Sequence, residues 1–342
     1  MDGDRWATLA GFAGALAVLA VLVAVVGVGD VVDALTEARV VVIPLVVLVA
    51  VVWLSLWGLA LKTVLSALGS PLPAHTAILV FSAAVFSNNV TPFGQAGGEP
   101  VSALLISQAA DAEYETGLAA IASVDTLHFV PSIGLAIVGF TFLTAGAVRL
   151  GRNLLFAAGA IVVLAVALPV GAYLGWRYRY ELEAAVVRAV TPLVRTLARV
   201  VPGRSPPSPH VVEDRIEGFF TAIDRVAADR RTLVLSMTLS GLGWLTLAAA
   251  LWLSLYALGA VVPVSAVVLV VPVAAIAGIT PLPGGSGAIE TVLVTLLVPT
   301  AGVPANVALS AVLLYRGATY WLPLVVGGGV ASVLGADRIR NR

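Results

Sequence analysis

Between Thr232 and Ala336 the chain carries only two charged residues, Glu290 and Arg316. A typical soluble domain has about 25% charged residues, whereas the 342 residues of this chain are 11% charged and 60% hydrophobic. The mean hydropathy is +1.03. The chain is therefore too apolar to cover itself with a polar surface in water. The sequence predicts an integral membrane protein.

Six apolar segments are long enough to cross a bilayer as helices, since a span needs about 20 mostly apolar residues. Four are unbroken, and two contain titratable side chains: Asp125 and His128 in one, and Arg316 in the other. The first segment lacks a cleavage signature, so we expect it to remain as a span. The six predicted transmembrane helices cover residues 7–28, 40–61, 116–148, 154–176, 232–258 and 305–334.

Two further apolar segments, 75–87 and 265–279, run into stretches rich in proline and glycine. Residues 88–100 form the first of these stretches, the first tip, and residues 280–290 form the second tip. Proline and glycine at this density end a helix. Irregular backbone at membrane depth is stable only where protein or a wet cavity covers it. The sequence therefore predicts an all-α polytopic fold in which two re-entrant helical hairpins accompany the six spans.

Basic residues indicate how the chain is oriented, because cytoplasmic loops carry an excess of Arg and Lys. With a cytoplasmic N-terminus, fifteen Arg and Lys residues fall inside and three fall outside, namely Arg39, Arg149 and Arg152. We therefore expect a multi-pass plasma-membrane protein with both termini in the cytoplasm. In this topology residues 1–342 form one domain, divided into a first half 1–175, a cytoplasmic amphipathic block 176–231 and a second half 232–336.

The two halves match in sequence and run through the membrane in opposite directions. Each tip contains a Thr-Pro pair and then a glutamate, Glu99 or Glu290, and a charged residue follows each glutamate by 26 positions, Asp125 or Arg316. Broken segments at corresponding places in inverted halves indicate a transport site near the midplane. The alternative is chance, because glycine and proline are common in membrane helices.

Three motifs carry a resemblance to a known family. They are Thr91-Pro92-Phe93-Gly94-x-x-Gly97-Gly98-Glu99-Pro100 after Asn88-Asn89, Leu282-Pro283-Gly284-Gly285-x-Gly287-x-x-Glu290, and Tyr315-Arg316-x-x-Thr319-Tyr320-Trp321-Leu322-Pro323. With these residues the chain resembles the flippase-like family named for the transmembrane region of lysylphosphatidylglycerol synthase. The resemblance implies an integral membrane protein related to translocases of aminoacylated phosphatidylglycerol. Related modules are found near glycosyltransferases that use lipid-linked sugars.

One position departs from the family pattern. After the first tip, many members of the family look as if they carry an Arg followed three residues later by an Asp. This chain has Asp125 and His128 at that place. The first half therefore lacks the basic partner that the resemblance would supply. This departure leaves open which substrate and which coupling ion the chain uses.

The predicted substrate site combines both tips with the helix after the second one. Arg316 would contact a phosphate through its planar guanidinium, or else pair with a glutamate and hold the hairpins together. We expect the half-helices to begin near Glu99-Pro100 and Ser286-Gly287, where free N–H groups suit an anionic headgroup. The alternative is that each glutamate caps its own helix. The predicted substrate-binding residues are Asn88, Asn89, Thr91, Gly94, Gly97, Gly98, Glu99, Thr280, Gly284, Gly285, Gly287, Glu290, Arg316 and Tyr320.

The acidic residues of the site outnumber its single base. This imbalance predicts proton or cation coupling, with Glu99, Asp125, His128 and Glu290 as the candidate residues. His128 lies three positions after Asp125 on the same helix face and could relay a proton, although a buried histidine with one hydrogen bond is the more common case. The three histidines are scattered and cysteine is absent, so no metal site or cofactor is expected.

These features predict a lipid translocase that is not an enzyme. Its partner would be a membrane lipid with a phosphate-bearing headgroup, of the phospholipid or polyprenyl-phosphate type. A membrane-associated glycosyltransferase or lipid-synthesising enzyme is a further expected partner, and nucleic acid is not, because no basic face is present. Three alternatives remain: an ion-coupled carrier of a small soluble anion, an intramembrane lipid-modifying enzyme that uses Glu99 or Asp125–His128, and a scaffold for a glycosyltransferase.

Overall fold

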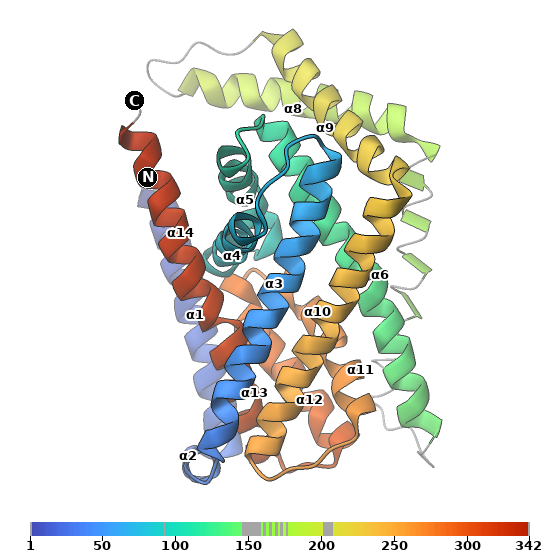
Figure 1. Cartoon of the computed structure of the whole chain (residues 1–342). Coiled ribbons are helices and arrows are strands. Elements are labelled where there is room, and N and C mark those ends of the chain that lie inside the picture. Colours follow the sequence, from blue (N-terminus) through green and yellow to red (C-terminus); the bar gives the residue numbers. More distant parts are fainter. Residues whose placement is uncertain are drawn as a thin grey trace.

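The computed structural model describes residues 2–91, 93–145, 177–200 and 208–340, together with isolated positions between 159 and 175. Within this part of the chain the regular secondary structure is helical, which confirms the predicted all-α fold (Figure 1). The elements are α1 (Asp2–Val26), α2 (Val28–Thr36), η1 (Val40–Val42), α3 (Ile43–Ala67), α4 (Ala74–Val90), α5 (Gln95–Ala109), α6 (Tyr114–Ala145), α8 (Arg179–Val200), α9 (Pro209–Ala228), α10 (Arg230–Ala257), α11 (Val264–Ala275), η2 (Ile276–Ile279), η3 (Pro283–Gly285), α12 (Ala288–Ala301), α13 (Ala305–Thr319) and α14 (Trp321–Arg340).

Five helical segments are long and apolar enough to cross a membrane, or six if the bent pair α1–α2 counts as one span. Predicted spans coincide with α1, with η1–α3, with α6, with α10 and with α13–α14. The chain turns by 87° between α1 and α2, at Gly27. The predicted span 154–176 falls mostly outside the described residues.

One of these five segments is Pro283–Ala301, which is long and apolar enough to be counted as a span. Its first three residues form η3, where Gly284 departs from helical geometry with φ 56°. The continuous helix α12 has 14 residues, which at 1.5 Å per residue falls well short of a bilayer core of about 30 Å. We therefore interpret α12 as a half-helix, as the sequence predicts.

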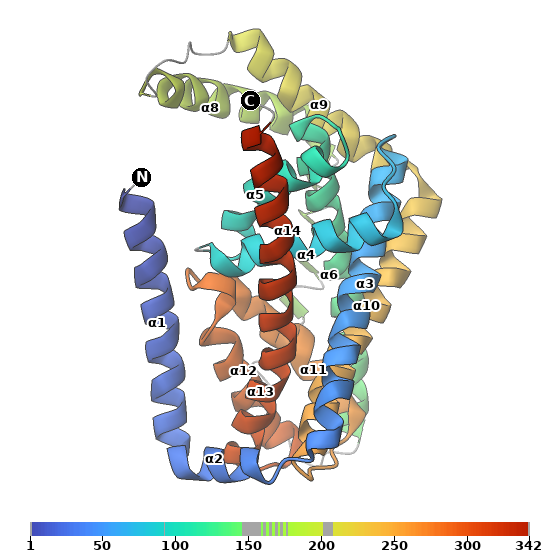
Figure 2. The ribbon, with the colours of Figure 1, turned by 60° about the vertical axis from the view of Figure 1, so that its left-hand side comes forward.

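The two hairpins enter the bundle from opposite ends. Figures 1 and 2 place α4 and α5 toward the end that carries both chain termini, and α11 and α12 toward the other end. Within each pair the two half-helices pack on each other. The helix α13 rises from the second end, and α14 continues from it toward the first end.

The connections into the hairpins repeat each other closely. Leu68-Gly69 and Pro73 precede α4, and Leu258-Gly259 and Pro263 precede α11. Both glycines have positive φ, 86° and 79°. The residue after each glycine donates its N–H to a leucine carbonyl five positions back, at 3.0 Å in both cases. The halves thus share local geometry as well as sequence.

Packing between the halves follows the same inverted pattern. The helix α6 packs on α11 and α14 packs on α4, while α3 and α10 pack along each other at the centre. A Cβ placed on Gly139 of α6 would lie 2.7 Å from the backbone nitrogen of Leu269, and one on Gly327 of α14 would lie 2.8 Å from the Phe86 Cβ. Both interfaces therefore need glycine for the close approach of two helices.

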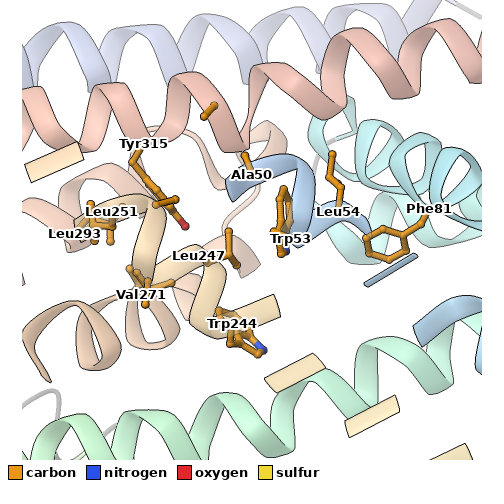
Figure 3. Close-up of a cluster of buried hydrophobic side chains, with 14 of the residues drawn as sticks. Ala50, Trp53, Leu54, Phe81, Trp244, Leu247, Leu251, Val271, Leu293 and Tyr315 are labelled. Atoms are coloured by element: carbon orange, nitrogen blue, oxygen red, sulfur yellow. The ribbon is translucent and has the colours of Figure 1, made fainter. Parts of the chain in front are cut away.

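The apolar core lies along α3 and α10. Side chains of α4, α11, α12 and α13 complete it, as Figure 3 shows for Trp53, Phe81, Trp244, Leu247 and Tyr315. Burial of these side chains holds the helices of both halves in contact. The tips are therefore positioned by a packed scaffold.

Outside the bundle, α8 lies across α9 at the end that carries the termini (Figure 1). The helix α9 contacts the first half on either side of the hairpin α4–α5. Arg215 pairs with Glu115 at 3.2 Å, and Arg225 donates to the Leu68 carbonyl at 3.4 Å. These contacts connect the amphipathic block to the start of α6 and to the end of α3.

Candidate functional site

The second tip is closed by a hydrogen bond from its own glutamate. Gly287 is the N-cap of α12 with φ 86°, a conformation that favours glycine. Glu290 stands at the third helical position, and its Oε2 accepts the Gly287 N–H at 2.6 Å. This is the glutamate half of a capping box. The start of α12 at Ala288 agrees with the predicted start near Ser286-Gly287.

Arg316 joins the second tip to the last turn of α13. Its Nε donates to Glu290 Oε1 at 2.6 Å, and its Nη2 donates to the Gly284 carbonyl at 3.2 Å. The guanidinium also lies over the Tyr320 ring, 4.8 Å from the centroid. Side chains of Arg316 and Glu290 are 15% and 7% exposed, so their charges neutralise each other largely away from solvent. This is the ion pair that the sequence leaves open as an alternative.

The first tip has a different geometry, and one prediction about it is wrong. The helix α5 begins at Gln95, four residues before the predicted start near Glu99-Pro100. Gly97 and Gly98 therefore lie inside the first turn, and Pro100 lies inside the helix. A Cβ on Gly98 would lie 2.7 Å from the Asn88 Cα, so this glycine allows α5 to pack against α4. It does not form the turn.

Because α5 starts early, Glu99 is the fifth residue of its helix and does not cap it. The side chain of Glu99 is partly buried, and no hydrogen bond or ion pair joins it to a residue that the structure describes. The two glutamates that correspond in sequence thus differ in role. Glu290 is paired and capping, whereas Glu99 has a carboxylate without a described partner.

The two tips meet at the break between α13 and α14. Tyr320 donates its hydroxyl to the Asn89 carbonyl at 3.2 Å, and Asn89 Nδ2 lies 3.5 Å from the Tyr320 carbonyl. A Cβ on Gly284 would lie 2.9 Å from Asn89 Oδ1, and one on Gly94 would lie 3.0 Å from the Gly278 carbonyl. Residues predicted from both halves therefore converge on one contact.

Several residues predicted to bind substrate lie beside the contact between Tyr320 and Asn89 and take part in the structure of the tips. Thr91 donates its hydroxyl to the Ser87 carbonyl at 2.7 Å within its own hairpin. The Asn88 Oδ1 and Thr280 Oγ1 atoms are buried without a hydrogen-bond partner in the described structure. Gly285 is packed against Gly278 and Ile289, where a Cβ would lie 2.8 Å from each. These residues build the tips, and two of them leave polar atoms unsatisfied there.

His128 does not pair with Asp125. Its Nδ1 lies 2.9 Å from the Ser240 Oγ of α10, and its ring lies 4.0 Å from that of Trp57. Trp244 donates to the His128 carbonyl at 3.0 Å. The histidine thus belongs to an aromatic cluster between α3, α6 and α10, which corresponds to the alternative of a buried histidine with one hydrogen bond.

Asp125 lies on α6, and α6 packs on the half-helix α5. Its Oδ2 is buried without a hydrogen-bond partner among the described residues, and its carboxylate is close enough to that of Glu99 to interact electrostatically. Across the described residues no group of three or more His, Asp or Glu side chains could hold a metal ion.

Sequence reasoning missed two contributors. Ser286 lies with its Oγ 3.5 Å from Arg316 Nη2, and Ser102 of α5 lies within hydrogen-bond distance of the Ala84 carbonyl of α4, at 3.3 Å. The position of Ser286 between two glycines of the second tip could have indicated its contact with Arg316. No sequence pattern indicated a contact for Ser102, because Ser102 lies after the motif of the first tip.

A sequence profile of the family described as "Lysylphosphatidylglycerol synthase TM region" matches residues 9–327, which include both hairpins and Arg316. The chain belongs to this family. Two relatives of the chain are each described as a "UPF0104 membrane protein". One, from Methanothermobacter thermautotrophicus, is 25% identical over 290 residues, which cover 82% of this chain and 78% of the relative.

The second relative, from Pyrococcus horikoshii, is 24% identical over 252 residues, which cover 71% of this chain and 72% of the relative. Both matches extend over most of each protein and concern membrane proteins. The lysylphosphatidylglycerol synthase TM region family and the apolar helices together identify a multi-pass membrane protein.

Proposed function

We propose that this protein is a lipid translocase of the plasma membrane that moves a phosphate-bearing headgroup between leaflets. The observation that supports this most directly is the meeting of two oppositely directed hairpins beside Arg316. Broken helices that meet in this way expose backbone groups at membrane depth, where a polar headgroup needs partners. In this proposal both termini lie in the cytoplasm, and the chain has no enzymatic activity.

Arg316 is the proposed phosphate ligand. Its Nε and Nη2 atoms donate hydrogen bonds to protein acceptors, whereas Nη1 donates none to a described residue. A phosphate oxygen could bind Nη1 while the Glu290 ion pair stays in place. Arg–phosphate hydrogen bonds are charge-assisted and stronger than neutral ones. The ion pair thus orients the guanidinium and does not by itself prevent binding.

Exposed apolar side chains favour a lipid over a small soluble anion. Phe93, Ile279 and Trp321 are 57%, 75% and 59% exposed, and each is next in sequence to a residue of the tip contact: Gly94, Gly278 or Tyr320. A closed site for a soluble ion would not need such groups at its edge. A headgroup at the tips with acyl chains beside it would contact them. The driving force would be an ion gradient or the lipid's own concentration difference.

The proposal is tested with fluorescent phosphatidylglycerol in proteoliposomes, in which lipid that reaches the outer leaflet is quenched by dithionite. The wild-type protein should speed crossing above that of empty liposomes. Arg316→Ala should slow the protein-dependent rate about tenfold or more, since a hydrogen bond to a charged group contributes about 1.5–3 kcal/mol. The control Arg188→Ala changes an arginine on α8, which lies outside the bundle.

Different outcomes would support the alternatives. Uptake of radiolabelled phosphate without lipid crossing would indicate a soluble-anion carrier. A chemically altered lipid in mass spectra would indicate an enzyme. Crossing at the same rate by Arg316→Ala would remove this residue from the mechanism.

A further inference from the structure

We propose that Glu99 and Asp125 form a binding site for one exchangeable monovalent cation, H⁺ or Na⁺, at the place where the second half holds the guanidinium of Arg316. The two carboxylates come from α5 and α6, which pack on each other. The site lies in the first half, apart from the Glu290–Arg316 pair. The argument combines the inverted repeat with a buried carboxylate oxygen that has no partner.

Comparison of the two inverted halves indicates that the first half lacks the cation that pairs with the glutamate in the second. In the second half, Glu290 on the half-helix α12 pairs with Arg316 on the following helix, 26 positions later, at 2.6 Å. In the first half, Glu99 lies on the half-helix α5, and Asp125 stands 26 positions later on the following helix α6, which packs on α5. The connections and the helix packing of the two halves correspond as well. The first half therefore has the glutamate without its fixed cation.

The orphaned oxygen is independent evidence for a ligand. Asp125 Oδ2 is buried, and neither it nor the Glu99 carboxylate has a hydrogen-bond or ion-pair partner in the described structure. Placing a charged group inside a spanning helix costs about 2.5–3.5 kcal/mol. Two neighbouring carboxylates also repel each other. A bound proton or sodium ion removes one charge and satisfies the oxygen.

Among the residues that the structure describes, the helices packed on α5 and α6 supply no fixed cation at this depth. The helices α11 and η2 carry no charged or titratable side chain. His128 on α6 is held by Ser240. The charged groups of α9 lie at the end of the bundle, where Arg215 pairs with Glu115. Tyr114, at the start of α6, donates its hydroxyl to the Pro100 carbonyl at 3.4 Å and is not a cation. The remaining titratable residues of packed helices lie toward the helix ends: Lys62, His75, Arg230, Arg231, Tyr256 and residues 337–340.

A single positive charge matches the geometry best. The guanidinium in the second half has one charge, and two carboxylates offer four oxygens, whereas Ca²⁺ takes 6–8. If the proposed translocase function holds, the site would couple lipid movement to a cation gradient. The binding site itself does not depend on that function.

Infrared difference spectroscopy of the full chain in lipid nanodiscs tests the site without any lipid transport. One arm acidifies the sample. The other replaces N-methylglucamine by Na⁺ at constant pH. A protonated-carboxyl band that the wild-type protein shows in the first arm and the site variants lack identifies H⁺, and a shifted carboxylate band in the second arm that the site variants lack identifies Na⁺. Glu99→Gln and Asp125→Asn should each remove the band, while the exposed control Glu37→Gln should keep it.

A further variant makes the test specific to the repeat. Asp125→Arg places a fixed cation where the second half has one, so it should abolish the cation-dependent band and leave the protein folded. If Asp125→Asn does not fold, Glu99→Gln alone tests the site, because the Glu99 side chain is partly exposed and its substitution is less disruptive. The proposal is overturned if no band responds to acid or Na⁺, or if Glu99→Gln leaves the responding band unchanged. Either result stands whether or not the protein moves lipid.

Discussion

The two hairpin tips have related sequences and different chemistry. Glu290 lies at the third position of α12, where it reaches back to the N-cap of its helix and forward to Arg316. Glu99 lies at the fifth position of α5 and has neither contact among the described residues. Side-chain reach explains this difference, because only an acid at the third helical position can accept from the N-cap N–H.

The glycines of the tips differ in the same way. Gly284, Gly285 and Gly287 have positive φ and form the turn before α12. Gly97 and Gly98 are helical, and Gly98 lets α5 approach α4. The second tip is thus a fixed structure with its charges paired, whereas the first is a close-packed hairpin whose acid has no described partner. In the second half Arg316 thus neutralises the tip glutamate, whereas in the first half no described residue supplies a cation to Glu99.

The largest expected effect comes from breaking the ion pair of the second tip. Arg316→Ala should lower the free energy of unfolding by about 3–5 kcal/mol, because it leaves a buried carboxylate without its partner. Thermal unfolding of the detergent-solubilised protein, followed by tryptophan fluorescence, measures the change. The double variant Arg316→Met with Glu290→Gln should be less destabilised than Arg316→Ala, since it leaves no buried charge. A double variant as unstable as the single one would mean that packing dominates this contact.

A smaller effect is expected from adding a methyl group at either tip. Gly98→Ala crowds Asn88, and Gly284→Ala both strains a φ of 56° and crowds Tyr320, where the new Cβ would lie 2.7 Å from the ring. Each should cost about 1–3 kcal/mol of unfolding free energy, which is typical of overpacking. Chemical denaturation in mild detergent measures the loss.

The matched control for both glycines is Gly134→Ala on α6, where a Cβ would have no neighbour within 4 Å. This change should stabilise the helix by about 0.5–1 kcal/mol, because alanine loses less backbone entropy than glycine. If Gly98→Ala stabilised the protein as Gly134→Ala does, α4 and α5 would not approach each other as closely as described. If Gly284→Ala stabilised it, the described turn before α12 would be contradicted.

Much of this architecture could be predicted from the sequence, because hydrophobic length and proline-glycine breaks act locally. Five of the predicted spans coincide with described helices, and both tips interrupt helices near the predicted places. The match of Leu68-Gly69 with Leu258-Gly259, before prolines at equal spacing, was available in the sequence as further evidence for the repeat and was missed.

The remaining features depend on tertiary contacts. The start of α5 at Gln95 depends on how closely Gly98 fits against Asn88, which no local pattern encodes. Spacing alone put His128 on one face with Asp125, but Ser240, 112 positions away, is its partner. The choice between a phosphate ligand and an ion pair for Arg316 also depended on the distance to Glu290, which only the folded chain defines.

The smallest expected effect on stability separates the tips most directly. Glu99→Gln should not lower the free energy of unfolding, because it removes a charge that repels Asp125 and breaks no hydrogen bond to a described residue. The isosteric Glu290→Gln should cost clearly more, because it removes the charge that pairs with Arg316 while leaving the side-chain volume unchanged. Both are measured by thermal unfolding at neutral pH with Na⁺ absent. Equal losses in the two variants would mean that Glu99 has a fixed cationic partner after all, and the contrast between the halves would fail.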